Sequence, residues 1–313
     1  MNKSNARIVY AVVIVAVILG SFGGGYLFAK VLTPEKGQEG TSVDRIISLS
    51  AACTEIIYAV GAGDKLVGVD QSSVDYALAG NETFREAPGQ LEDYPIDIFN
   101  KTNVGKASNP NMELIVSLHP DIVFAWWYNT EVNKRIGDLG IPVVTVNPQN
   151  VSDVFNLVKT IGALVGKSAE ADAVISEMEM RIDAITEKVS SLTDDEKPLV
   201  YYELGTALKT VGPGTFTNEL ISMAGGINIA ANESVRYPLL SNEYIIEKNP
   251  DVIVVVSYGA SVDEIKDREG WQEIDAVKND RVYAIESGWV TASPRLVLGL
   301  EAFAQWFHPE LFD

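Results

Sequence analysis

ELIVSLHPDIVFAW at residues 113–126 and EYIIEKNPDVIVVV at residues 243–256 are two copies of one pattern. Glu113, Pro120 and Asp121 each recur 130 positions further along the chain. Each copy predicts a short helix that stops before its proline, because proline cannot continue a helix, and then an apolar strand that is buried on both faces. Two copies of such a unit predict two lobes of similar topology.

The segments around each copy extend the similarity. A further strand is expected after each copy, PVVTV at 142–146 and RVYAI at 281–285. A weaker match relates TEIIYAVGAG at 54–63 to NELISMAGG at 218–226, and both segments predict helices that end at glycine. RIISL at 45–49 begins a strand–helix–strand unit, which favours a mostly parallel sheet covered by helices. The predicted fold class is therefore α/β.

A long helix is expected between the two copies. Apolar residues recur there every three or four positions, as on one helix face: Val174, Met178, Ile182, Ile185 and Val189. A helix over 169–190 would be ~33 Å long at 1.5 Å per residue, about the width of a domain. We expect it to run as a strut from one lobe to the other. A long helix that covers one continuous sheet is the alternative.

These patterns divide the chain of 313 residues into five parts. We expect a membrane segment at 1–30, a linker at 31–42, an N-terminal lobe at 43–150, an interlobe helical segment at 151–195 and a C-terminal lobe at 196–313. Apolar residues make up 47% of the chain, which is enough for a sizeable core.

The N-terminal segment is expected to place the rest of the chain outside the cell. Residues 8–29 carry no charge, and a helix needs ~20 such residues to cross a bilayer. Lys3 and Arg7 precede them, so the positive-inside rule keeps the N-terminus in the cytoplasm. We expect a retained anchor in the cell membrane. The alternative is a cleaved signal peptide with its apolar core at 8–19, which would leave the body secreted.

Charge and missing motifs exclude several classes of function. The formal charge of −19 repels nucleic acid. GxSxG, P-loop and HExxH motifs are absent from the sequence, so we expect neither an enzyme nor a bound cofactor. Cys53 is the single cysteine and is expected to be a small buried side chain. His119 and His308 each precede a proline and are expected at the surface, so a bare metal ion would lack ligands.

Five segments, in order along the chain, together resemble the cobalamin and iron-chelate binding-protein family that serves ABC importers. They are RIISLSAACTEIIYAVGAGDKLVGV (45–69), NPNMELIVSLHPDIVFAW (109–126), TVGPGTFTNELISMAGGINIA (210–230), YPLLSNEYIIEKNPDVIVV (237–255) and ASPRLVLGLEAFAQWFHPELF (292–312). The resemblance implies two Rossmann-like lobes with mostly parallel sheets joined by one long helix, the class III binding-protein architecture. It also implies an ABC permease dimer and its ATPase as partners.

In that family a glutamate on each lobe docks into arginines of the permease, and by position Glu113 and Glu243 match those two. One carboxylate per lobe would suit a twofold-related permease. The same glutamates also have a structural role to play. An acid in the first turn of a helix is favoured by the helix dipole, with Asn111 or Ser241 as the cap. Both roles can hold at once.

The resemblance further implies a ligand site between the lobes, lined by loops at strand ends. The candidate ligand-binding residues are Ser72, Ser73, Lys106, Trp126, Trp127, Tyr128, Phe216, Arg236, Tyr237 and Trp289. Arg295 is expected to anchor a helix start instead of touching the ligand.

The candidates leave the ligand open between two metal chelates. Lys106 and Arg236, with Arg85, would serve an anionic ferric siderophore-type complex. The aromatic loop at 126–128, facing Tyr237, would cover a flat corrinoid. Lys106 or Ala107 stands where the cobalamin branch carries a tryptophan, so we place the ferric chelate narrowly first. A membrane-anchored receptor without a transport role is a third possibility.

Overall fold

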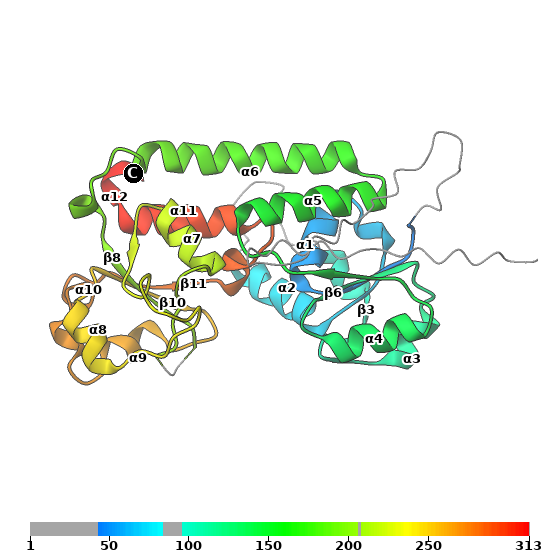
Figure 1. Cartoon of the computed structure of the whole chain (residues 1–313), viewed down its shortest axis with the longest axis horizontal. Helices are drawn as coiled ribbons and strands as arrows, with labels where there is room; N and C mark the ends of the chain where they lie inside the picture. Colours follow the sequence, from blue (N-terminus) through cyan, green and yellow to red (C-terminus); the bar gives the residue numbers. More distant parts are fainter. Residues whose placement is uncertain (1–42, 84–95, 206–207, 313) are drawn as a thin grey trace, which may run out of the picture.

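A computed structural model describes residues 43–83, 96–205 and 208–312 of the chain. Figure 1 shows two separate sheets, one in each half of the molecule. The first sheet has the order β3 (Thr102–Asn103), β2 (Leu66–Val69), β1 (Ile46–Leu49), β6 (Ile122–Trp126) and β7 (Val143–Val146), and all its pairs are parallel. The second has the order β11 (Val282–Ile285), β10 (Val252–Val256), β8 (Leu199–Glu203) and β9 (Ile227–Asn228), again all parallel.

Helices cover both sheets, and a short antiparallel hairpin, β4 (Gly105–Lys106) with β5 (Asn109–Pro110), lies beside the first. The α-helices are α1 (Ala51–Ala59), α2 (Gln71–Thr83), α3 (Met112–Ser117), α4 (Thr130–Asp138), α5 (Val151–Val165), α6 (Ser168–Val189), α7 (Phe216–Met223), α8 (Asn242–Lys248), α9 (Val262–Lys266), α10 (Asp275–Lys278), α11 (Leu296–Phe307) and α12 (Pro309–Phe312). Short 3-10 helices are η1 (Gly63–Lys65), η2 (Ile96–Asn100), η3 (Asp194–Glu196), η4 (Trp271–Glu273) and η5 (Ser287–Val290).

The repeat in the sequence is a repeat in the fold. The order β2-β1-β6-β7 of the first sheet matches the order β9-β8-β10-β11 of the second. Helices α3 and α8 precede the central strands β6 and β10, as the two sequence copies predict. At the end of each helix, His119 and Asn249 take the left-handed conformation with φ of 47° and 46°, which turns the chain into the proline. The prediction of two lobes with similar topology is confirmed.

The aspartate of each copy ties two strands together at their starts. The Asp121 carboxylate accepts hydrogen bonds of 2.9 Å from the backbone N–H groups of Asp44 and Arg45, just before β1. In the second lobe the Asp251 carboxylate accepts a bond of 2.8 Å from the N–H of Leu199, the first residue of β8. These bonds satisfy backbone donors at the start of a central strand, which gives the recurring aspartate a structural role.

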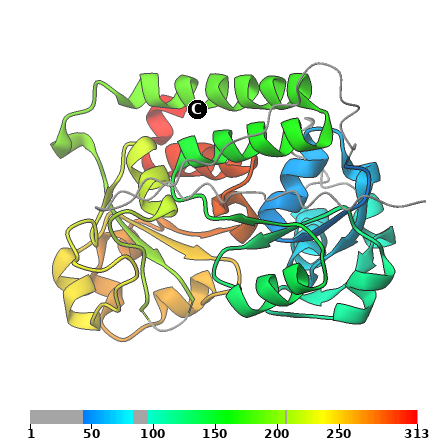
Figure 2. The ribbon, with the colours of Figure 1, turned by 45° about the vertical axis from the view of Figure 1, so that its right-hand side comes forward.

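The long helix lies where the sequence predicts it. Helix α6 spans Ser168–Val189 and runs along both halves of the molecule in Figures 1 and 2. All five residues of the predicted apolar stripe are buried in it. The helix packs on α5 at one end and on α7 and α11 at the other. Because the strands form two sheets, the alternative of a single continuous sheet is wrong.

The two lobes share one hydrophobic core. Along β6, Ile122 and Phe124 point into a core that also contains Val254 of β10, while Val123 points to a smaller core under α3 and α4. Along β10 the neighbouring Ile253 faces a third core under α8 and α9. Each sheet is therefore buried on both faces, as expected for parallel strands, and the layer of α5, α6 and α11 joins the lobes.

Two expectations about single residues have different outcomes. Cys53 is fully buried, as predicted, and burial raises the pKa of its thiol to about 12. The surface position predicted for both histidines is wrong for His308, whose exposed fraction is 1%. Its Nε2 lies 3.1 Å from the carbonyl oxygen of Gly225, because the chain folds back at the end of α11 and presses the ring against the turn after α7. His119 is exposed.

The predicted membrane segment and linker lie outside the described residues, as does Arg85. Within the ranges that the structure describes, no helix combines the length and the apolar character that crossing a bilayer requires.

Candidate ligand-binding site

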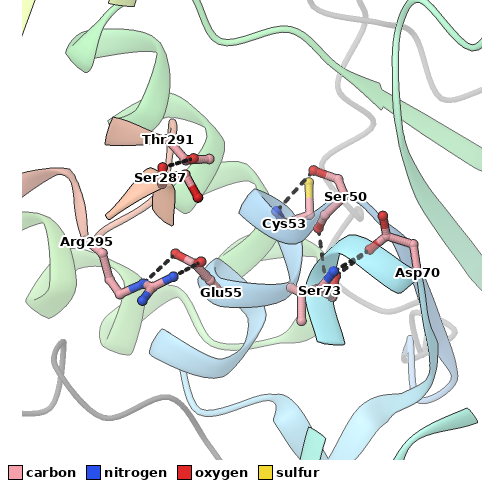
Figure 3. Close-up of polar contacts among 9 residues, drawn as sticks. Ser50, Cys53, Glu55, Asp70, Ser73, Ser287, Thr291 and Arg295 are labelled. Carbon is pink, nitrogen blue, oxygen red and sulfur yellow. Dashed lines mark hydrogen bonds and ion pairs between the residues drawn. The ribbon is translucent and has the colours of Figure 1, made fainter. Parts of the chain in front are cut away.

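The carboxyl end of β2 carries a buried polar network (Figure 3). The Ser73 hydroxyl donates to the Asp70 carboxylate at 2.5 Å and lies 2.8 Å from the Thr54 hydroxyl. Burial raises the pKa of Asp70, although hydrogen bonds from Ser73 and Ser72 act against that rise. Ser73 is fully buried and its hydroxyl is engaged in this network, so the structure leaves it no surface for a ligand. Ser72, next to it, is exposed.

The aromatic run after β6 forms a stacked pair. The rings of Trp126 and Tyr128 lie 5.9 Å apart with 13° between their planes. Trp126 packs on the shared core, whereas the exposed fraction of Tyr128 is 58%. Partial burial, with Asp70 and Tyr76 close by, raises the pKa of Tyr128. Tyr128 therefore lies near the carboxyl ends of β2 and β6. The ring of Trp127 contacts it edge-on, with 6.2 Å between the ring centres.

The second lobe carries two more exposed tyrosines, Tyr258 and Tyr237. Tyr258 lies two residues beyond the end of β10, and its exposed fraction is 63%. Partial burial raises its pKa, and Tyr76 and Tyr237 are close enough to add to the rise. Tyr237 is also exposed, with the Lys209 ammonium 5.7 Å from its ring centre. Tyr76 of the first lobe thus lies near tyrosines of both lobes.

Tyr258 was absent from the sequence-based candidates, although one signal could have found it. It stands 130 positions after Tyr128, the spacing that relates the two copies of the repeat. Tyr76 gave no comparable signal, because α2 has no sequence counterpart in the second lobe. Only the packing of α2 against η5 brings Tyr76 to this place.

The two predicted cationic side chains, Arg236 and Lys106, have different surroundings in the structure. The Arg236 guanidinium donates to the carbonyl oxygen of Gly214 at 2.6 Å and to the side-chain oxygen of Gln149, which belongs to the other half of the molecule. Arg236 is therefore held across the two lobes. Lys106 is exposed on the β4–β5 hairpin.

Phe216 and Trp289 are half-buried and pack on the shared core. Among the described residues no group of histidine, cysteine and carboxylate side chains has the arrangement of a metal site.

Beneath the tyrosines, a buried ion pair joins the lobes (Figure 3). Arg295, directly before α11, donates to both carboxylate oxygens of Glu55 on α1, at 3.1 and 2.5 Å. The side-chain exposed fractions are 6% and 5%. Next to this pair, the Thr291 hydroxyl of the second lobe donates to the carbonyl oxygen of Ser287 at 2.9 Å, and both residues lie near the Tyr76 hydroxyl. Arg295 stands at a helix start, as expected, and its charge is directed at Glu55.

The two glutamates of the repeat lie on exposed helix ends. Glu113 and Glu243 are exposed in the first turns of α3 and α8. Side-chain oxygens of Asn111 and Ser241 cap these helices, as predicted. In Figures 1 and 2 both helices lie at the side of the molecule that is remote from α6, one in each lobe.

Comparison with known proteins gives this fold and site their class. A family model described as periplasmic binding protein matches residues 46–288. An ABC transporter substrate-binding lipoprotein of Bacillus subtilis is 34% identical over 276 residues, which cover 86% of this chain and 81% of the relative. A cobalamin-binding protein of Halobacterium salinarum is 32% identical over 282 residues, which cover 85% and 69%. A solved periplasmic solute binding protein from Veillonella parvula is 28% identical with a TM-score of 0.72, covering 87% and 83%.

The two lobes and their joining helix thus define a substrate-binding protein, the component that ABC importers use to capture their cargo. The chain belongs to the periplasmic binding protein family. This membership places it among transport proteins and not among enzymes.

Proposed function

We propose that this protein captures a corrinoid outside the cytoplasm and delivers it to an ABC permease. The observation that carries the proposal is that exposed tyrosines of both lobes lie in one neighbourhood: Tyr128 and Tyr258 are both near Tyr76, and Tyr237 is near Tyr258. Flat rings on two sides suit a large flat ligand, which they cover with little loss of side-chain entropy. A relative named as cobalamin-binding is 32% identical to this chain, which supports the same ligand class.

The choice of a corrinoid over an anionic ferric chelate reverses the order that the sequence suggested. That order relies on Arg236 as a cation that is free to reach the ligand, whereas hydrogen bonds to the neutral oxygens of Gln149 and Gly214 hold its guanidinium in place. Lys106 is exposed and Lys209 lies over the Tyr237 ring, and these two ammonium groups keep a ferric siderophore-type complex as the second candidate.

Titration by intrinsic tryptophan fluorescence, backed by native mass spectrometry, tests the ligand. We expect saturable quenching by cobalamin at micromolar or lower concentration and a 1:1 complex. Haem and a panel of ferric siderophores serve as competitors. Tight binding of a ferric siderophore with no response to cobalamin would establish the second candidate. Tight binding of zinc or manganese ions would remove the whole class of chelates.

Delivery to the permease is proposed to use Glu113 and Glu243, one exposed carboxylate per lobe at the side remote from α6. Replacing both with alanine is expected to abolish cobalamin uptake by cells that depend on this protein, with an unchanged Kd for cobalamin. The matched control replaces Glu131 and Glu247, which are exposed acids on α4 and α8, and should leave uptake intact. Normal uptake by the Glu113→Ala/Glu243→Ala variant would remove the docking assignment.

The membrane segment at 8–29 is proposed to tether the body outside the cell, in keeping with the lipoprotein relative. Protease added to intact cells should then degrade the body of the protein. A variant that begins at residue 43 should no longer be found in the membrane fraction. Protection from protease in intact cells would contradict this location.

A further inference from the structure

The two copies of the repeat place one tyrosine each at the same point of their lobes. Tyr128 follows the end of β6 by two residues, and Tyr258 follows the end of β10 by two residues. The exposed fractions are similar, 58% and 63%. The two strands occupy equivalent central positions in sheets of matching order, so the two tyrosines are related by the internal symmetry of the fold.

Both tyrosines approach a common neighbour. Tyr76 is close enough to act electrostatically on Tyr128 and also on Tyr258. Its own hydroxyl lies near Thr291 and Ser287 of the second lobe, which act on its pKa. Tyr76 is therefore a shared neighbour of the symmetric pair, one member of which comes from each lobe.

We propose, on the basis of the function proposed above, that Tyr128 and Tyr258 are a symmetric pair of specificity-determining residues, one from each lobe, whose hydroxyl groups donate to the neutral amide carbonyls at the rim of a flat macrocyclic ligand.

The charges around the pair favour a neutral rim over an anionic one. The carboxylate of Asp70 lies near Tyr128. Near Tyr76, the carboxylate of Glu55 is balanced by the guanidinium of Arg295. The guanidinium of Arg236 already donates to Gln149 and Gly214, and that of Arg295 donates to Glu55. The Asp70 carboxylate would repel an anionic group placed against Tyr128, whereas it does not oppose an amide.

The chemistry of the pair fits donation. Partial burial and the neighbouring acids and phenols raise the pKa of both tyrosines, so each hydroxyl keeps its proton at neutral pH. A protonated phenol can donate one hydrogen bond while its ring covers part of the ligand face. One hydroxyl donor from each lobe would also fix the orientation of the macrocycle between the lobes.

Single and double tyrosine-to-phenylalanine variants test the pair, because they remove the hydroxyl and keep the ring. Tyr128→Phe and Tyr258→Phe should each weaken cobalamin binding by about 2- to 10-fold, the range of one net hydrogen bond. The double variant should show roughly the product of the two factors. Tyr244→Phe is the matched control: its hydroxyl bonds to the carbonyl oxygen of Ile229 within the second lobe, and the Kd should not change.

Failure of this pair is distinguishable from failure of the proposed ligand. If wild-type protein binds cobalamin and both phenylalanine variants bind it equally well, the pair is overturned and the corrinoid function stands. A loss confined to one of the two tyrosines overturns the symmetry. If wild-type protein binds a ferric siderophore in place of cobalamin, the neutral-rim assignment is overturned together with the ligand. The melting temperature of each variant, expected to match wild type, excludes a folding defect.

Discussion

Glu55 and Arg295 carry opposite charges at the place where the two lobes meet, 240 residues apart in the chain. Both side chains are almost completely buried, and their two hydrogen bonds align the carboxylate with the guanidinium. A buried ion pair adds little over an apolar pair of the same volume, because removing both charges from water is costly. Losing one partner is far more costly, because the other charge then stays buried without compensation.

We therefore expect Glu55→Gln to lower the free energy of unfolding by about 3 kcal/mol, the cost of removing one charge of a buried pair. Urea unfolding at neutral pH measures it. The double variant Glu55→Leu/Arg295→Met should recover part of the loss, since it removes both charges. As a control, Lys134→Ala breaks an ion pair whose side chains are 70% and 63% exposed and should leave stability at the wild-type value. Equal effects of Glu55→Gln and Lys134→Ala would contradict the buried role.

Asp70 gives a pH dependence whose sign is set by its burial. Its pKa is raised above the ordinary value of 3.8, so the folded protein binds this proton at a higher pH than the unfolded chain does. Between the ordinary and the raised pKa, stability contributed by this group is lost as pH rises. Above both values the contribution is constant.

Asp70→Asn removes that titration while keeping an oxygen that can accept from Ser73. The quantity to follow is the difference in free energy of unfolding, wild type minus variant. This difference should fall as pH rises from the ordinary pKa of aspartate through the raised pKa of Asp70, and it should then stay level. Urea titrations at closely spaced pH values above 3.8 measure the difference, in which other carboxylates cancel. A difference that rises with pH over this window would show that the hydrogen bonds, and not burial, dominate at Asp70.

At the scale of single elements, α6 owes its position to one apolar stripe. Met178 in that stripe is fully buried, whereas Met180, two residues on, points to solvent with an exposed fraction of 64%. Residues two apart face different sides of a helix, so the same residue type samples both environments. The two methionines form a natural pair for measuring what the packing of this helix contributes.

Met178→Ala should lower the free energy of unfolding by about 2–5 kcal/mol, because it leaves a cavity where α6 meets the shared core. Met180→Ala should change it by less than about 0.5 kcal/mol. Denaturant unfolding of both variants, with helix content checked by circular dichroism, makes the comparison. Similar losses in the two variants would mean that α6 is not held by this stripe.

At the scale of the whole molecule, the shared core limits how the lobes can move. The core extends from Ile122 of the first sheet to Val254 of the second through α5, α6 and α11. Close-packed interiors resist shear, and the ion pair of Glu55 with Arg295 ties the same interface. Relative motion of the lobes would have to break these contacts.

Binding of ligand should consequently cause only a small rearrangement. Small-angle X-ray scattering with and without saturating cobalamin should give the same radius of gyration within error. Arg236→Ala, which cuts the exposed link to Gln149, should leave that value unchanged, since the buried contacts remain. A clear compaction on ligand addition would show a hinge motion that the shared core does not allow.

The sequence by itself determined the repeat, the helices and strands next to it and the long helix. These features depend on contiguous residues: Pro120 and Pro250 stop a helix wherever they stand, and the spacing of Met178 and Ile182 defines a helix face without reference to the rest of the chain. Asn111 capped its helix as predicted for the same reason, because a cap and its helix are a few residues apart.

Only the tertiary structure decided what happens between the lobes. The link from Arg236 to Gln149 and the pair of Glu55 with Arg295 join positions 87 and 240 residues apart, and nothing local in the sequence selects such partners. The sequence therefore predicts a cation at Arg236 that is free to move, whereas the structure holds its guanidinium against Gln149. The proline after His308 predicts a surface position, yet burial depends on which segment packs over a turn. Tyr258 could have been found from the repeat, whereas Tyr76 reaches the site only because the packing of α2 against η5 brings the two lobes together.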